Sequence, residues 1–385
     1  MKGAVAKGER KSRGRTGYYD YNLLAVVIIL TCFGLVMLYS ASSYEAANVF
    51  EDDMYYFGRQ AAISAVAVAA ALIISKLDYH IFAKWSVHLY VLALILMAMV
   101  KFTPLGVTAG GARRWLNLGI RFQPAEFAKI AVILFLPLVI LKMGRKIRER
   151  KAVLTLLALG LVPAAAAYLL TDNLSTGVII MAISILILFL AYPRTRPFLV
   201  TLVIGAAVIA AVLLLLYKNV DGTSDFRLNR ILTWFHPEEN QTGGGWQVLQ
   251  GLYAIGSGGF FGKGLGNSVQ KLSTIPEAQN DMIFSIICEE LGLFGAILLL
   301  ILFGYLLYRL FFIAQNAPDL YGTLIVSGIF AHIALQVILN ICVVLNVIPT
   351  TGVTLPFVSY GGTSVLFLMG EIGVALSVAR RIRLE

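Results

Sequence analysis

Charged side chains are scarce in this chain: Asp, Glu, Lys and Arg make up 14% of its 385 residues. Soluble domains carry about a quarter charged residues, so this composition excludes an ordinary soluble protein. Cysteine occurs three times, at Cys32, Cys288 and Cys342, each time inside an apolar run. An odd number of thiols in such runs predicts neither a disulfide framework nor a metal site.

Two further features are missing from the sequence. No small-residue cleavage site follows the first apolar run, Tyr21 to Tyr39, so we expect a membrane span there and not a cleavable signal peptide. No internal repeat is found, which disfavours transporters built from inverted repeats.

Apolar residues, in contrast, are abundant: 59% of the chain is hydrophobic and the mean hydropathy is +0.82. This composition predicts an all-α polytopic membrane protein with about ten transmembrane helices and a large extracytoplasmic loop, residues 218–281, between spans seven and eight. The expected spans are 20–42, 58–75, 84–101, 124–142, 152–170, 174–192, 198–217, 282–308, 321–345 and 358–379.

Positive charge predicts the orientation. With a cytoplasmic N-terminus, 20 of the 31 Lys and Arg residues fall on cytoplasmic segments, six of them in the basic tail 1–19 and six between 142 and 151. We therefore expect both termini in the cytoplasm and one membrane domain over 20–385. The net charge of +10 then reports topology and attraction to anionic membrane lipid, and no nucleic acid partner is needed.

Three acidic residues, Asp281, Glu289 and Glu290, stand where the eighth apolar run begins. A carboxylate at bilayer depth costs about 2.5–3.5 kcal/mol, so such residues usually have a function. Asp281 could be the N-cap of the helix, or a general base facing a water-accessible cleft, and both roles can coexist. The two glutamates could pair with a basic group elsewhere, such as Lys129.

The external loop at 102–123 contains a pair of arginines, Arg113 and Arg114, and no acidic residue. Planar guanidinium groups match phosphate oxygens, although an ordinary loop with an interfacial tryptophan would look similar. Glu126 and Lys129 follow at i and i+3 on one helix face and could neutralise each other. This second pair is as consistent with a structural role as with catalysis.

A glycine-rich stretch, Tyr253 to Lys271, lacks the strand and spacing of a P-loop. Its backbone amides, with Lys263, could contact a lipid pyrophosphate, or the stretch could be a re-entrant turn that needs close packing. Another broken segment, Asn346 to Ser364, contains Ser359 and either lines a cavity or forms a tight loop without chemistry. His332 is predicted to be a hydrogen-bonded core residue.

Together these segments resemble the SEDS family (shape, elongation, division and sporulation), which includes FtsW, RodA and SpoVE. The matching motifs occur in order along nearly the whole chain: GARRWL, QPAEFAK, RILTWFHPEE, GSGGFFGKGLGNSVQKL, PEAQND…EELG and PTTGVTLPFVSYGGTS. Two of these motifs, GSGGFFGKGLGNSVQKL and PEAQND…EELG, look closer to the FtsW/SpoVE branch than to RodA. Asn173 replaces an acid found in many relatives, and Gln279-Asn280 replaces a His-Thr pair, so neither position is expected to perform proton chemistry.

The resemblance implies a peptidoglycan glycosyltransferase that polymerises lipid II on the outer face of the cytoplasmic membrane. Implied partners are a class B penicillin-binding transpeptidase and other division or sporulation membrane proteins. Asp281 is the expected catalytic base of an inverting reaction that needs no nucleotide, with a divalent cation, Mg or Mn, as an optional helper. The expected substrate-binding residues are Arg113, Arg114, Glu126, Lys129, Lys263, Glu290 and Ser359. A lipid II flippase and a non-enzymatic division scaffold remain as alternatives.

Overall fold

A computed structural model of the chain describes residues 18–383, apart from 110, 118, 120, 195, 197, 199, 201–202, 204, 206–232, 239–243 and 273–274. Ten α-helices are placed within this part, together with one short 3₁₀ helix, Gly144–Arg148. The α-helices are α1 (Tyr21–Phe50), α2 (Tyr55–Lys76), α3 (His80–Phe102), α4 (Pro124–Met143), α5 (Arg150–Thr171), α6 (Leu174–Ala191), α9 (Gly244–Gly258), α10 (Ile283–Asn316), α11 (Leu320–Val344) and α12 (Thr363–Ala379).

The helices confirm the predicted class of polytopic helical membrane protein. Eight of them are long and apolar enough to span a bilayer, namely α1 to α6, α10 and α11, and α12 is an apolar helix of 17 residues. Nine of the ten expected spans therefore appear as helices. The seventh, 198–217, and the basic tail 1–19 lie mostly outside the described residues.

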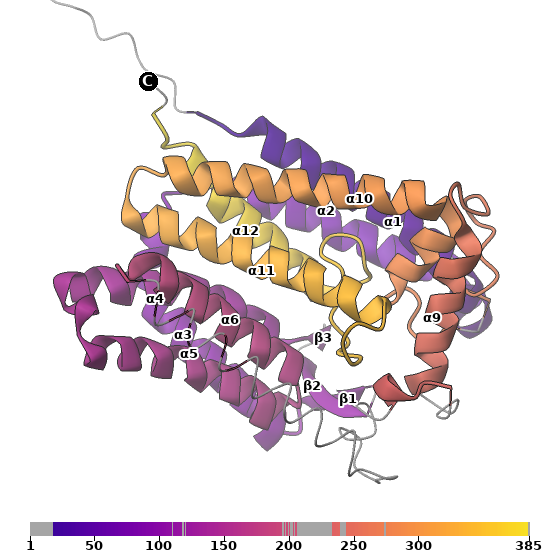
Figure 1. The fold of residues 1–385 in the computed structure, drawn as a ribbon, viewed down its shortest axis with the longest axis horizontal. Helices are drawn as coiled ribbons and strands as arrows, with labels where there is room; N and C mark the ends of the chain where they lie inside the picture. Colours follow the sequence, from indigo (N-terminus) through magenta and orange to yellow (C-terminus); the bar gives the residue numbers. More distant parts are fainter. Residues whose placement is uncertain are drawn as a thin grey trace, which may run out of the picture.

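A small antiparallel sheet follows α3, where only a loop was expected. Its strands are β1 (Gly106–Ala109), β2 (Ala112–Asn117) and β3 (Arg121–Phe122), in the order β1-β2-β3. The turn between β1 and β2 passes through Gly111 at φ +76, a conformation that glycine adopts without steric cost. The sheet lies at one end of the helix bundle (Figure 1), so β2 presents its two arginines there.

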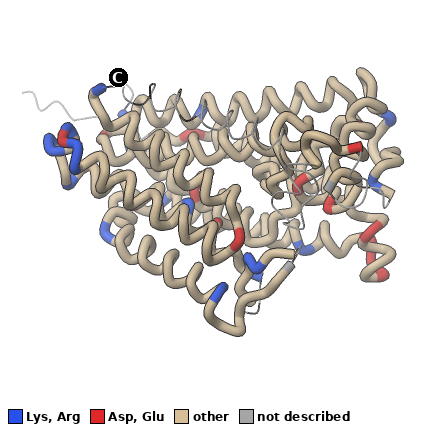
Figure 2. Tube along the Cα trace, turned by 60° about the horizontal axis from the view of Figure 1, so that its bottom comes forward, with Lys and Arg blue, Asp and Glu red and all other residues tan. Residues whose placement is uncertain are grey.

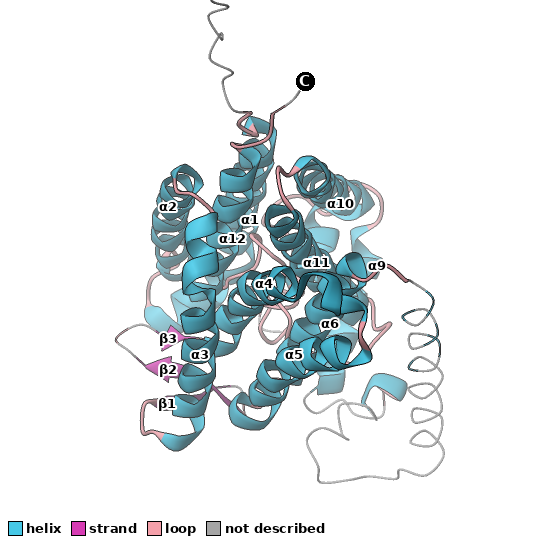
Figure 3. Ribbon diagram, turned by 90° about the vertical axis from the view of Figure 1, so that its left-hand side faces the viewer, coloured by secondary structure: helices cyan, strands magenta, loops and turns pink. Residues whose placement is uncertain are grey.

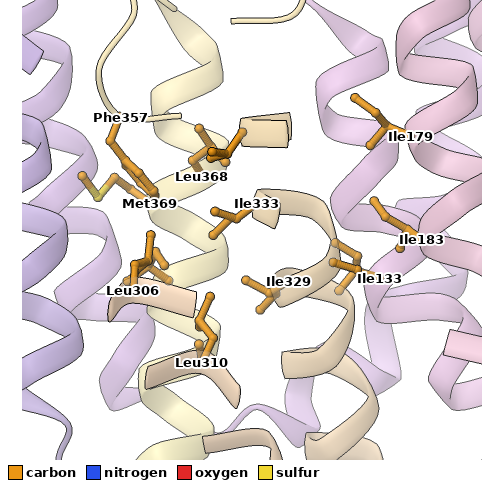
Figure 4. Close-up of a cluster of buried hydrophobic side chains, with 14 of the residues drawn as sticks. Ile133, Ile179, Ile183, Leu306, Leu310, Ile329, Ile333, Phe357, Leu368 and Met369 are labelled. Atoms are coloured by element: carbon orange, nitrogen blue, oxygen red, sulfur yellow. The ribbon is translucent and has the colours of Figure 1, made fainter. Parts of the chain in front are cut away.

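The core lies where α11 meets helices from both halves of the bundle. Figure 4 shows Ile329 and Ile333 of α11 between Ile133 and Ile183 on one side and Leu306 and Leu368 on the other. These side chains are almost completely buried. In Figure 3 α4 and α11 likewise occupy the middle of the bundle, with α1, α2 and α10 around one side of it.

The two ends of the described chain lie together at the end of the bundle opposite the sheet (Figure 1). Tyr18 N donates to Ile382 O at 3.4 Å, and Arg309 Nη2 bonds the buried carboxylate of Asp20 at 2.7 Å. Figure 2 shows many of the Lys and Arg residues gathered at this end. Ten membrane spans would put both termini on the same side of the membrane. The position of both chain ends at one end of the bundle agrees with this prediction.

Candidate active site

Asp281 lies two residues before the start of α10, beside the sheet end of the bundle. The interpretation of Asp281 as an N-cap is wrong, because the helix begins at Ile283, its N-cap is Met282 and that cap has no side-chain hydrogen bond. The carboxylate instead accepts a hydrogen bond at Oδ1 from Gln247 Nε2, at 3.3 Å. Asp281 is half-buried, so its side chain is accessible from outside the bundle.

Asn340 of α11 holds the main chain at Asp281. Its Nδ2 donates to Asp281 O and to Val353 O, both at 2.8 Å, and the side chain is fully buried. One amide therefore ties the start of α10 to the broken segment 345–362. No motif marks Asn340 in the sequence, although an amide within a membrane span is itself a signal of a specific polar contact.

Gly352, in the broken segment, is the point at which two predicted site residues meet. A Cβ atom added to this glycine would lie 3.9 Å from Arg114 Nη1 and also 3.9 Å from Asp281 Oδ2. Arg114 Nη1 and Asp281 Oδ2 are therefore separated by no more than twice 3.9 Å. Gly352 itself is exposed, and Asp281 and Arg114 are half-buried.

The surrounding contacts hold this meeting point in place. Arg114 Nη2 donates to Asp172 O at 3.3 Å, and Ser175 Oγ donates to Thr351 O at 2.9 Å. The first contact involves the turn between α5 and α6, whose backbone at Asp172 has φ +47, and the second involves the first turn of α6. Segments that are far apart in the sequence thus converge around Gly352.

Arg113 does not join Arg114 in this site. Successive residues of a strand point to opposite faces of a sheet, and Arg113 Nη2 donates to Thr103 O at 2.6 Å. Its guanidinium also covers Gly106, where an added Cβ would lie 2.5 Å from Nε. Arg113 therefore braces the junction between α3 and β1.

The two glutamates of α10 bind the glycine-rich stretch, and neither of them pairs with Lys129. Glu289 Oε1 accepts from Lys263 Nζ at 2.6 Å and from Val269 N at 3.2 Å. Glu290 Oε1 accepts from Lys271 Nζ at 2.7 Å, with both side chains buried. The expectation that these acids pair with basic groups elsewhere is confirmed, whereas Lys129, the example given for such a group, is wrong.

The glycine-rich stretch packs closely against a break in α10. Gly292 has φ +67 inside that helix, and Leu293 N donates to Gly259 O at 3.0 Å. A Cβ at Gly262 would lie 2.2 Å from Glu290 O. The structure thus places Lys263 and Glu290 in contacts that hold the glycine-rich stretch to α10.

The remaining candidates also make local contacts. Lys129 Nζ lies 2.9 Å from Glu126 Oε1 inside α4, and Lys129 is 1% exposed. Ser359 Oγ accepts from Leu355 N at 2.9 Å and closes a turn. His332 is a buried core residue, as predicted, and its Nδ1 lies 2.8 Å from Oε2 of the buried Glu371.

A metal site is not apparent among the described residues, which contain no group of three or more His, Cys, Asp or Glu placed to hold an ion. Assistance by Mg or Mn therefore stays a prediction, in which the substrate pyrophosphate would supply further oxygen ligands.

Known proteins share this architecture. The profile of a family described as cell cycle protein, FtsW/RodA/SpoVE, matches residues 20–384. The chain belongs to this family. Stage V sporulation protein E of Bacillus subtilis is 37% identical over 372 residues, covering 94% of this chain and 98% of the relative. A probable peptidoglycan glycosyltransferase FtsW of Trichlorobacter lovleyi is 37% identical over 377 residues, covering 96% and 95%.

Solved structures of the family agree with the fold. A chain of a peptidoglycan synthase complex, described as coordinating polymerization and crosslinking, superposes with a TM-score of 0.77 at 28% identity, covering 94% of this chain and 98% of its own. The rod shape determining protein RodA of Thermus thermophilus gives 0.68 at 27% identity, covering 95% and 98%. These relatives confirm the predicted membership of the family.

Proposed function

We propose that this protein is a peptidoglycan glycosyltransferase that polymerises lipid II into glycan strands during division or sporulation. The observation that carries the proposal is the meeting of Asp281 and Arg114 at the exposed Gly352. Relatives named as probable peptidoglycan glycosyltransferases support the reaction class. The Asp281 carboxylate and the Arg114 guanidinium suit a displacement reaction at a sugar that carries a phosphate leaving group.

The chemistry follows from these two side chains. The Asp281 carboxylate takes the proton of the acceptor's 4-hydroxyl as that oxygen attacks the anomeric carbon of the donor. The bond from this carbon to the pyrophosphate oxygen breaks, its electron pair leaves with the polyprenyl pyrophosphate, and the configuration inverts. Arg114 stabilises the charge that develops on the leaving group, because its guanidinium is a preorganised donor for phosphate oxygens.

The site would work on the outer face of the cytoplasmic membrane. The basic residues at the end that holds both chain ends favour a cytoplasmic position for that end, and Asp281 would then lie on the outer side. A class B transpeptidase is the proposed partner, supported by the structural similarity to a complex that polymerises and crosslinks.

The test is a gel assay of glycan made from labelled lipid II by purified protein in detergent, with and without chelator. The wild-type protein should form polymer, and Asp281→Asn should unfold at the same temperature but form none. Polymer made in detergent, where no membrane separates two sides, would argue against a flippase alone. It would equally oppose a scaffold without activity. A normal yield from Asp281→Asn would remove Asp281 as the base.

A further inference from the structure

Helix α9 packs against the start of α10 through small residues that lie on one face. A Cβ at Gly258 would lie 2.0 Å from Cys288 O, and a Cβ at Gly251 would lie 2.4 Å from Met282 Cε. Ala254, between them, is completely buried. Residues 251, 254 and 258 follow helical spacing, so the contact sets how far α9 lies along α10.

Gln247 occupies the next position of this face, one turn before Gly251, and therefore reaches past the start of α10. Its Nε2 donates to Asp281 Oδ1 and to Pro276 O, both at 3.3 Å. Both partners can only accept, so the amide nitrogen must face them. One NH2 group thus bridges the two ends of the turn from Pro276 to Asp281.

We propose that Gln247 is a positioning residue that orients the carboxylate of Asp281 toward the acceptor hydroxyl. Asn340 holds the main chain of Asp281 from α11, and Gln247 holds its side chain from α9. With Oδ1 engaged by Gln247, Oδ2 is the oxygen near Gly352, on the side where Arg114 lies. This inference rests on the proposed function and adds to it the element that sets the direction of the base.

The charged surroundings of Asp281 make the inference testable by pH. Arg114 approaches from β2 and Glu277 lies in the same turn, whereas α9 and residues 345–362 contain no charged side chain. In Gln247→Glu a second carboxylate faces Asp281, and a like charge raises the pKa of a carboxyl group. Because the base must be ionised, the acidic limb of the rate profile should move to higher pH.

The experiment measures polymerisation of labelled lipid II by the full-length protein in detergent, from pH 4.5 to 8. Gln247→Ala should lower kcat about tenfold with little change in KM. The expected size of the effect is that of losing one hydrogen bond to a charged group. Gln247→Glu should shift the acidic limb of kcat/KM upward by about one pH unit. Thermal unfolding of each variant checks that the protein remains folded.

Tyr253→Glu is the matched control, because Tyr253 is 56% exposed on the same helix and the variant adds the same charge. Its acidic limb should coincide with that of the wild type. An unchanged limb in Gln247→Glu together with an unchanged kcat in Gln247→Ala would overturn the positioning role. A wild-type protein without activity would instead contradict the proposed function, so the two failures are distinguishable.

Discussion

Arg113 and Arg114 are neighbours in β2, yet their guanidinium groups serve opposite faces of the sheet. Arg113 Nη2 bonds Thr103 O at 2.6 Å, whereas Arg114 Nη1 lies 3.9 Å from the Cβ position of Gly352. The alternation of side chains along a strand requires this separation. Arg113 therefore stabilises the junction between α3 and β1, and Arg114 is the candidate for binding phosphate.

Alanine at each arginine should separate these roles. Arg114→Ala should lower kcat/KM at limiting lipid II by about 10- to 100-fold, because a charge-assisted contact to phosphate is lost. Arg113→Ala should lower the unfolding temperature and leave the KM for lipid II nearly unchanged. Steady-state kinetics and thermal unfolding on the same preparations check both. Equal KM effects for the two variants would contradict the division.

Breaking the buried pair between Lys271 and Glu290 should destabilise the protein strongly. Their side chains lie 2.7 Å apart and are almost fully buried, so Lys271→Met leaves an uncompensated charge that costs about 3–5 kcal/mol. The double variant Lys271→Met/Glu290→Gln should recover much of this loss. Denaturant unfolding in detergent measures both, and a single variant as stable as wild type would refute the coupling.

Gly262 should tolerate no side chain, because its Cβ would lie 2.2 Å from Glu290 O at φ +78. Gly262→Ala should detach the glycine-rich stretch from α10 and abolish polymerisation. Gly266 is the matched control, since it has φ +84 and nothing within 4 Å of its Cβ position. Gly266→Ala should cost only the backbone penalty of about 1–2 kcal/mol. Similar losses in the two variants would argue against the packing explanation.

Asn340→Leu should reduce stability and activity together. The change leaves Asp281 O and Val353 O without the amide that now bonds both at 2.8 Å, and each unpaired buried carbonyl costs about 1–3 kcal/mol. Asn316→Leu, an exposed amide at the end of α10, should be nearly neutral. Unfolding and gel assays compare the two. Full activity in Asn340→Leu would show that the tie is dispensable.

Asp78, between α2 and α3, should make stability depend on acid pH. Burial raises the pKa of Asp78, but the His80 backbone N–H and the Arg381 guanidinium outweigh it and lower the pKa to about 2. A carboxyl group whose pKa is lower in the folded state stabilises the fold at every pH above its pKa in the unfolded chain, about 3.9. This contribution is lost as the pH falls toward about 2. The stability difference between wild type and Asp78→Asn should therefore shrink over that range, as measured by thermal unfolding, and a constant difference would contradict it.

Much of the site could be anticipated from local sequence, but its pairings could not. Asp281 and Arg114 were predicted as site residues, and each lies 3.9 Å from the Cβ position of Gly352, while their roles stay predictions. Lys129 was offered as a partner for the glutamates of α10, and its actual partner is three residues away. Gln247 and Asn340 passed unnoticed, because a single amide carries no pattern that distinguishes a site from a core contact.

The sequence by itself determined the membrane class, nearly every span and the common end of the two termini. These properties depend on about 20 consecutive apolar residues and on charge counts in short loops, which are local quantities. Tertiary structure alone decided which charges pair. Ser40 and Glu290 are 250 residues apart and bond at 2.7 Å, and such contacts exist only where packing brings distant helices together and leaves buried polar groups to satisfy one another.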